Sequence, residues 1–217
     1  MRTFRIFLQQ KLVIRALALG VTLVGVNACG IFDKAKASVE AAAELPLDAT
    51  ESTKITLDVS AVLGAAAGQT TPTELKQDVT TPPAVVDLNK SQPDLAKYAN
   101  GHIKTVTITK ITVQPTTNTL TGDLPALDIY IGPTDAKSTA DGIKVATIPA
   151  IKAGSTTAFD AQIDTAAMAS AGSKYLAKLA FSQALKGTLQ VAAGGKVPSG
   201  KVDLKIDLGV HAVVSPL

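Results

Sequence analysis

The chain has 217 residues, of which 46 % are hydrophobic and 4 % are aromatic, with no Trp. This length suits one domain, or one domain with a tail, and a core of Val, Ile, Leu and Ala favours β-sheet layers. Four of the 21 basic residues and none of the 18 acidic ones precede Cys29, so the formal charge of +3 becomes −1 from Cys29 onward. Because nucleic-acid binding requires an electropositive patch on the working domain, this distribution argues against that function.

The first 28 residues show the charge pattern of an export signal. Residues 1–15 are basic, and an apolar stretch of eleven residues, Ala16 to Val26, leads to small residues. This order predicts a cleaved signal peptide over residues 1–28. The main alternative is an uncleaved transmembrane helix, since the 17 residues from Ala16 to Phe32 carry no charge and lie at the lower limit of a membrane span. Three glycines within those residues weaken that alternative.

The residues Val26-Asn27-Ala28-Cys29 follow the apolar stretch directly. They resemble the lipobox of bacterial lipoproteins, in which a branched apolar residue, a variable residue and a small residue precede the lipidated cysteine. The resemblance implies transfer of diacylglycerol to the Cys29 sulfur, cleavage between Ala28 and Cys29, and acylation of the new amino terminus. Val26 replaces the more common Leu, and Asn27 is unusual. Gly30 stands where Asp would retain a lipoprotein in the inner membrane, so the family's sorting rule implies the outer membrane.

Cys29 is the only cysteine of the chain. A single acyl chain binds a membrane only marginally, whereas two or more hold stably, so several chains on one cysteine would give a durable anchor. A lipidated Cys29 leaves no thiol for a disulfide, and stability must then come from packing. The alternative for Cys29 is a buried or incidental thiol.

Behind the cysteine, the sequence predicts a tether and then a folded domain. Residues 29–52 are rich in Ala and small polar residues, with Asp33 placed to cap a helix that runs to about Ala43. We interpret them as the lipidated N-terminus and a flexible tether. From Thr53 the apolar residues alternate with polar ones, which predicts a β-structured domain over residues 53–217.

The expected elements of this domain are mostly short strands. Strands are predicted over residues 55–59, 85–88, 103–113, 127–131, 143–148, 156–163, 185–192 and 201–210. In 103–113, Val106 and Ile108 have the opposite parity to Ile111 and Val113, so a β-bulge near Thr109 and Lys110 would place all four on one face. The Thr-rich segments 61–83 and 114–126 are expected to be loops, with one helical turn as the alternative for part of 61–83. Residues 165–181 suggest a helical segment interrupted near Gly172, with a second cap at Ser173.

Seven or eight strands with one short helical segment predict an all-β fold, an antiparallel β-sandwich. The pattern is similar to immunoglobulin-like or late-embryogenesis-abundant-type β-sandwich domains of exported proteins. This resemblance is architectural and implies no function.

Residues suited to chemistry are scarce in this sequence. The two histidines, His102 and His211, fall near strand ends, and no G-x-S-x-G motif accompanies them. Zinc would need more His and Cys ligands than the chain has, and Asp135 to Gly142 lacks the spacing of a calcium loop. Gly194-Gly195-Lys196 does not fit a phosphate-binding loop. Asp203 and Asp207 alternate with Lys201 and Lys205, which predicts surface ion pairs on one strand face. We therefore predict no catalytic residue, no cofactor and no metal site.

The leading hypothesis is a membrane-anchored envelope lipoprotein with a non-catalytic structural or binding role. Its expected partners are the membrane, through lipid on Cys29, and an envelope protein or the cell wall, and long polar loops are a common place for such recognition. An alternative is a periplasmic carrier of a lipid or other apolar ligand, in which the helical segment near Tyr175 covers a cavity between sheets. An enzyme with an unrecognised site is the least supported hypothesis.

Overall fold

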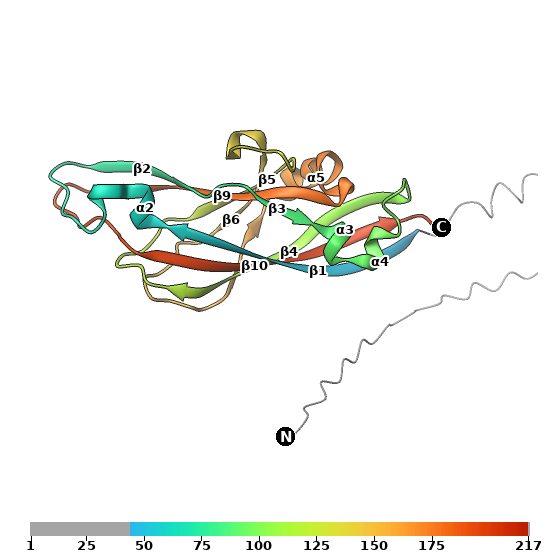
Figure 1. Cartoon of the computed structure of the whole chain (residues 1–217), viewed down its shortest axis with the longest axis horizontal. Helices are drawn as coiled ribbons and strands as arrows, with labels where there is room; N and C mark the ends of the chain where they lie inside the picture. Colours follow the sequence, from blue (N-terminus) through green and yellow to red (C-terminus); the bar gives the residue numbers. More distant parts are fainter. Residues whose placement is uncertain (1–43, 217) are drawn as a thin grey trace, which may run out of the picture. The chain divides into compact units, whose positions relative to one another are not determined.

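The computed structural model describes residues 44–216, which form two antiparallel β-sheets packed face to face (Figure 1). The first sheet contains, in spatial order, β1 (Leu45–Asp58), β10 (Lys201–Val214), β4 (Ile103–Asn118) and β7 (Phe159–Asp160). The second contains β2 (Leu75–Thr80), β9 (Ala180–Val191), β5 (Leu127–Gly132), β6 (Ile143–Ile148) and β8 (Gln162–Ile163), with β3 (Ala84–Asp87) also paired to β9. The predicted all-β antiparallel sandwich is confirmed, with ten strands in the described residues.

Short helices lie between and beside the sheets. They are α2 (Val59–Leu63), α3 (Leu88–Ser91), α4 (Pro93–Ala96) and α5 (Thr165–Lys174), with 3-10 turns at Gly64–Ala66, Thr139–Asp141 and Leu176–Lys178. None of the helices in residues 44–216 is long and apolar enough to cross a membrane.

The core lies between the inner faces of the two sheets. In β10 every second side chain is buried, from Val202 to Val214, and the residues between them are partly exposed. Leu127, Ile129 and Ile131 of β5 are buried in the facing sheet. The alternation predicted for residues 201–210 is therefore confirmed. The sandwich is stabilised mainly by removing these branched side chains from water.

β4 contains the predicted bulge. Ile108 pairs with Val210 and Lys110 pairs with Gly209, so Thr109 is the extra residue in the register and its Oγ1 bonds to β10, at the Gly209 carbonyl. The extra residue changes the parity of the strand, and the apolar residues on both sides of it are at most 2 % exposed. Both halves of the strand thus contribute to one core face.

The domain begins earlier than the predicted boundary at Thr53. β1 starts at Leu45 and pairs with β10 without a register shift, from Leu45 opposite Val214 to Asp58 opposite Lys201. Residues 45–52 are therefore part of the sandwich and not of a tether. Leu45, Leu47 and Ala49 alternate with Pro46, Asp48 and Thr50, but Glu51 interrupts this series before Thr53. Pairing with β10 makes the segment part of an edge strand, where Pro46 is tolerated. The predicted helix from Asp33, and Cys29 itself, lie outside the described residues.

The segment 61–83, predicted as a loop, contains α2 and β2. Only Val79 of β2 is buried, so its sequence lacks the apolar signal of a strand. Beyond β2, the Thr81 N–H donates to the Leu185 carbonyl at 3.0 Å, and the Leu185 N–H donates to Thr81 Oγ1 at 2.9 Å. Pro82 and Pro83 separate β2 from β3 at this point. The Thr81 side chain there accepts the hydrogen bond of the buried Leu185 N–H.

Other boundaries also differ. β4 extends into the predicted loop 114–126, the predicted strand 156–163 is reduced to the short β7 and β8, and β9 begins at Ala180. α5 is one helix capped by Asp164 and is not broken at Gly172. A Cβ on Gly172 would lie 2.7 Å from the Val106 carbonyl oxygen. This glycine therefore serves close packing of α5 on β4.

Candidate functional site

The predicted lipidation site, Cys29, and the cleavage site at Ala28 lie outside residues 44–216. The structure does show where the chain enters the sandwich. Leu45 lies opposite Val214, which in turn pairs with Ile103. We call this the β1-start end, and it is at the right of Figure 1.

Four loops gather at the opposite end of the sandwich, at the left of Figure 1. β4, β6 and β9 run toward this end, and β2, β5 and β10 start from it. We call these four segments the loop end; they are residues 67–74, 119–126, 149–158 and 192–200. The structure thus brings together parts of both Thr-rich segments that the sequence marked for recognition.

Backbone hydrogen bonds join these loops side by side. The Gly68 N–H donates to the Val197 carbonyl and the Thr71 N–H donates to the Gly195 carbonyl, each at 3.0 Å. On the other side of 192–200, the Thr121 N–H donates to the Ser199 carbonyl at 2.9 Å. Leu124 and Ile151 form an isolated antiparallel bridge that attaches the last loop. The loop end is therefore a connected surface and not four independent loops.

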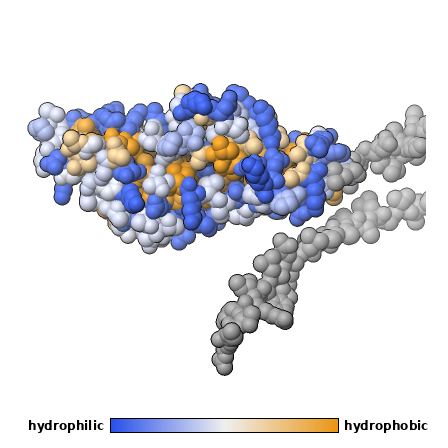
Figure 2. All heavy atoms as spheres, in the orientation of Figure 1, coloured by the Kyte–Doolittle hydropathy of each residue, from blue (hydrophilic) through white to orange (hydrophobic). Residues whose placement is uncertain are grey.

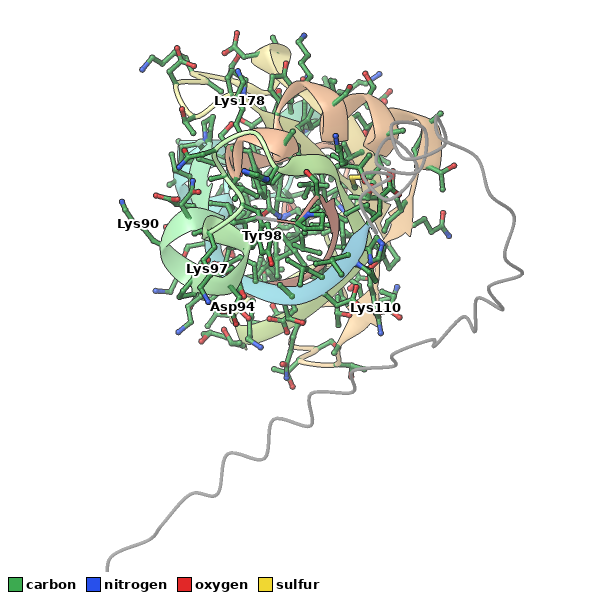
Figure 3. All side chains as sticks on the ribbon, turned by 90° about the vertical axis from the view of Figure 1, so that its right-hand side faces the viewer. Lys90, Asp94, Lys97, Tyr98, Lys110 and Lys178 are labelled. Carbon is green, nitrogen blue, oxygen red and sulfur yellow. The ribbon has the colours of Figure 1, made fainter. Side chains whose placement is uncertain are left out.

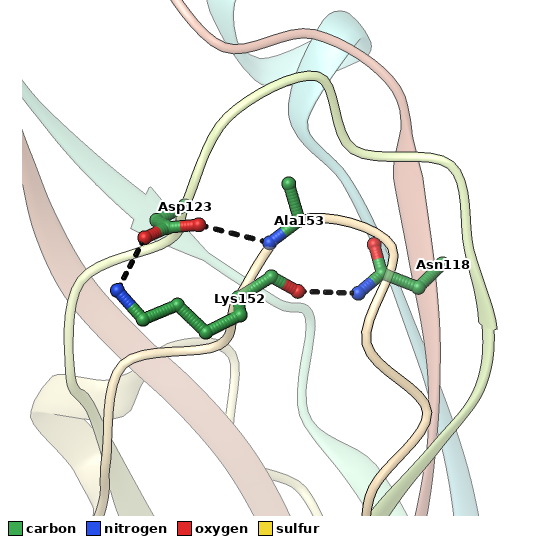
Figure 4. A network of polar contacts seen from close by, with 4 residues as sticks. All are labelled: Asn118, Asp123, Lys152 and Ala153. Carbon is green, nitrogen blue, oxygen red and sulfur yellow. Dashed lines mark hydrogen bonds and ion pairs between the residues drawn. The ribbon is translucent and has the colours of Figure 1, made fainter.

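A polar network holds the loops 119–126 and 149–158 together (Figure 4). Asp123 Oδ2 lies 2.6 Å from Lys152 Nζ, and Asp123 Oδ1 accepts a hydrogen bond from the Ala153 N–H at 2.9 Å. The Asn118 amide donates to the Lys152 carbonyl at 2.8 Å. The hydrogen bond from Lys152, and then that from Ala153, lower the pKa of Asp123. Sequence reasoning missed Asn118 and Asp123, although Asn and Asp are typical of turns that bond to backbone groups.

Gly200 joins the loop end to β10, and its backbone requires glycine. Its φ is +97°, and a Cβ at this position would collide with the Thr119 carbonyl oxygen. We expect Gly200→Ala to lower the free energy of unfolding by about 2–4 kcal/mol, because left-handed backbone strain and overpacking add. Urea unfolding measures this change. Gly194→Ala is the matched control, since Gly194 has a φ of +78° and open space around it, and it should cost only about 1 kcal/mol. Equal losses for the two variants would show that the Thr119 contact is unimportant.

The two histidines lie toward the β1-start end and bond to separate partners. His102 Nδ1 is 3.0 Å from the Pro216 carbonyl oxygen, and His211 Nδ1 is 2.8 Å from Asp48 Oδ1. Asp48 lies directly opposite His211 in the β1–β10 register. Both histidine rings are therefore strand-end side chains that bond to neighbouring parts of the chain.

The carboxylates singled out in sequence bond to close neighbours. Asp207 forms an ion pair with Lys205 at 2.8 Å and accepts a hydrogen bond from Ser52. Asp203 instead accepts a hydrogen bond from Thr56 Oγ1 at 2.8 Å. Within residues 44–216, no group of three or more His, Cys, Asp or Glu is arranged to hold a metal ion.

In the segment 135–142, Asp141 belongs to a capped turn. Its Oδ2 accepts hydrogen bonds from the Lys137 and Ser138 N–H groups at 2.9 and 3.0 Å. These two backbone bonds lower the pKa of the Asp141 carboxyl. The Asp141 carboxylate therefore stabilises the turn to which it belongs.

Asp207 should contribute a measurable pH dependence. The hydrogen bonds from Lys205 and then Ser52 lower its pKa below the ordinary value of 3.8. A carboxyl whose pKa is lower in the folded state stabilises the fold above its unfolded pKa, and this stabilisation is lost as the pH falls through the folded-state pKa. We expect the midpoint of thermal unfolding to depend less on pH below 3.8 in Asp207→Asn than in the unmodified chain. Lys205→Gln should reduce the same dependence, and unchanged curves for both variants would contradict this assignment.

Two lysines at the β1-start end, Lys90 on α3 and Lys97 after α4, are paired with acids (Figure 3). Lys97 Nζ lies 2.7 Å from Asp94 Oδ1, and Lys90 Nζ lies 3.3 Å from Asp87 Oδ2. Tyr98 lies beside the helices α3 and α4. This arrangement is typical of solvated surface pairs and does not form a uniformly basic patch.

Hydrophobic surface gathers in the middle of one face, in the seam between β1 and β3 (Figure 2). On β3, Val85 is 59 % exposed.

A cavity of about 170 Å³ lies elsewhere, between α5 and β4, with Lys104, Val106 and Gly172 among its lining residues. A second hollow, of about 490 Å³, lies at Glu74 and Gln190 near the loop end.

Comparisons with known proteins give no family for the chain. No family model matches it, and no curated protein matches it. Among solved structures, turnip yellow mosaic virus is similar at 11 % identity, covering 94 % of this chain and 91 % of that chain, with a TM-score of 0.32. Desmodium yellow mottle tymovirus is similar at 12 % identity, covering 93 % and 98 %, with a TM-score of 0.27. Neither TM-score reaches 0.5, so these similarities carry no argument about fold or function.

Proposed function

We propose that the chain is a membrane-anchored lipoprotein of the bacterial cell envelope with a non-catalytic structural or binding role. The observation that carries this proposal is the sequence Val26 to Cys29, placed directly behind a basic region and an apolar stretch of eleven residues. Gly30 next to the cysteine favours the outer membrane as its location. Lipid on Cys29 is then the contact with the membrane.

The geometry of the sandwich supports a binding role for its loop end. Fourteen residues lie between Cys29 and Glu44, and an extended chain of that length spans at most about 50 Å. Because β1 enters at one end and the four joined loops lie at the other, an anchor at Cys29 would leave the loop end free to meet an envelope protein or the cell wall. Recognition is often built on loops held by a rigid scaffold.

Two measurements on cells that produce the full chain test this proposal. Growth with a fatty-acid analogue should label the protein, and mass spectrometry should find Cys29 as its first residue. A photo-activatable amino acid at Lys196, in the loop end, should cross-link to a defined envelope component, whereas the same group at Lys174, exposed on α5, should not. An unlabelled chain would contradict the anchor, and equal cross-linking at both positions would contradict the assignment of the binding surface.

The geometry does not favour the alternative of a lipid carrier. A drug-sized or larger apolar ligand needs an enclosed, mostly apolar cavity of roughly 300–1,000 Å³, whereas the cavity beside α5 has about 170 Å³ and includes Lys104 in its lining. The hollow of about 490 Å³ near the loop end is lined by Glu74, Gln190, Ala192 and Ala193, which are all exposed, so it lies on the surface and not between the sheets. Between the sheets, side chains such as Phe181, Ile129 and Leu204 are fully buried and fill the layer.

A further inference from the structure

β1 is an edge strand whose outer side is partly uncovered. It pairs with β10 on one side and ends the first sheet on the other. Along the outer side, the Thr50 carbonyl accepts a hydrogen bond from Gln92 Nε2 at 2.9 Å, so this peptide group points away from β10. The β1–β10 register has no shift, and peptide orientation alternates along a strand. The peptide groups of Ser52, Lys54 and Thr56 therefore point away from β10 as well.

These three peptide groups have no hydrogen-bond partner in residues 44–216. They occupy a stretch bounded at one end by Gln92, before α4, and at the other by α2, which begins directly after Asp58. Figure 1 shows α2 and the pair α3 and α4 on either side of this part of β1. A free row of N–H and C=O groups is a template for another strand. From Ser52 to Thr56 it extends roughly 14 Å at the rise of an antiparallel strand.

The two faces beside this edge differ in chemistry. Ile55 and Leu57 belong to the buried inner face, and hydrophobic surface is visible in the seam between β1 and β3 (Figure 2). On the outer face, Lys54 lies opposite Lys205 in the register. Lys205 is already paired with Asp207, whereas Lys54 has no ion-pair partner within the described residues. Like charges directly opposite are unfavourable in a sheet, and an acidic neighbour on the other side of Lys54 would compensate for them.

We propose that the edge of β1 from Ser52 to Thr56 binds an extended segment of a partner protein as a fifth strand of the first sheet. The segment has apolar side chains on the face that continues Ile55 and Leu57, and an acidic side chain beside Lys54. Main-chain hydrogen bonds supply affinity and the alternating side chains supply specificity, as in other cases of strand addition. The ends of the site are set by α2 and by Gln92. This site is separate from the loop end and does not require lipidation of Cys29.

A fluorescent peptide of alternating Val and Glu is a suitable probe, with a peptide of alternating Val and Lys as its charge control. Anisotropy titrations with the purified full chain should show binding of the Glu peptide in preference to the Lys peptide. Lys54→Pro removes an N–H that faces away from β10, so it leaves the ladder with β10 intact, and it should weaken binding by about tenfold or more. Lys54→Ala keeps the peptide group, so it should retain binding but lose the preference for Glu.

Hydrogen exchange on the unmodified chain gives an answer that does not depend on a variant. The amides of Ser52, Lys54 and Thr56 should become protected when the Glu peptide is added. Those of Thr53 and Ile55 face β10 and should not change. The proposal is overturned if neither peptide binds, if Lys54→Pro folds and binds as well as the unmodified chain, or if the added protection appears elsewhere. None of these results bears on the lipid anchor, which fatty-acid labelling tests separately.

Discussion

Replacing Cys29 with Ser is expected to abolish labelling of the protein by a fatty-acid analogue and to leave the leader attached. The sulfur of Cys29 is the only thiol in the chain, and thioether formation with diacylglycerol requires a thiol. Without lipid, the membrane affinity contributed by the buried acyl chains, about 0.8 kcal/mol for each methylene, is lost. Gel fluorescence of the labelled protein and mass spectrometry of its N-terminus measure both effects.

A displaced cysteine gives the matched control for this prediction. In the Cys29→Ser background, Ser38→Cys restores a thiol nine residues further along the predicted tether but outside the Val26–Cys29 motif. We expect this double variant to remain unlabelled, because the motif and not the thiol alone selects the residue. Labelling that persists in Cys29→Ser would refute the anchor, and labelling restored by Ser38→Cys would refute the motif.

Phe181→Ala is expected to cause the largest loss of stability among single substitutions in the core. Phe181 is fully buried on the inner face of β9, where β3 pairs with it through Val86. Removing a buried Phe side chain leaves a cavity and costs about 3–5 kcal/mol. Since domains of this size are stable by about 5–15 kcal/mol, the variant should be only marginally folded. The midpoint of urea unfolding, monitored by circular dichroism, measures the change.

Val85→Ala is the control for that experiment. Val85 is on the neighbouring strand β3, beside Val86, but its side chain is 59 % exposed. Exposed substitutions usually change stability by about 0.5 kcal/mol or less. A loss of the same size in Val85→Ala and Phe181→Ala would mean that β3 and not the core limits the stability of the sandwich.

The sequence predicted those strands whose apolar residues alternate over several positions. β10 has five consecutive apolar residues of the same parity in 201–210, and the change of parity in β4 was enough to predict the bulge at Thr109. Local patterns predict such strands because burial of one face places an apolar residue at every second position of the sequence. The same reasoning failed for β2, in which only Val79 is buried, because its pairing with β9 is set by the whole sheet.

The candidate binding surfaces were harder to predict from the sequence than the strands were. The Thr-rich segments were recognised as potential binding loops, but their association with residues 192–200 depends on backbone hydrogen bonds between distant parts of the chain. The open edge of β1 follows from the order of strands in the sheet, which single-strand patterns do not encode. The N-terminal motif is different. It is predicted from the sequence alone, because it is defined by a local order of basic residues, an apolar stretch and a cysteine.

The uninterrupted pairing of β1 with β10 also bears on how the domain would carry mechanical load. If the chain is held through Cys29 and the loop end grips a fixed partner, force acts along β1, and its fourteen residues resist together in shear. If the partner instead held the C-terminus, Leu45 and Val214 would be pulled apart at one end, and the ladder would unzip one pair at a time. A sandwich with this strand order can therefore stay intact under tension between a membrane and its loops, yet open easily when pulled from both chain ends.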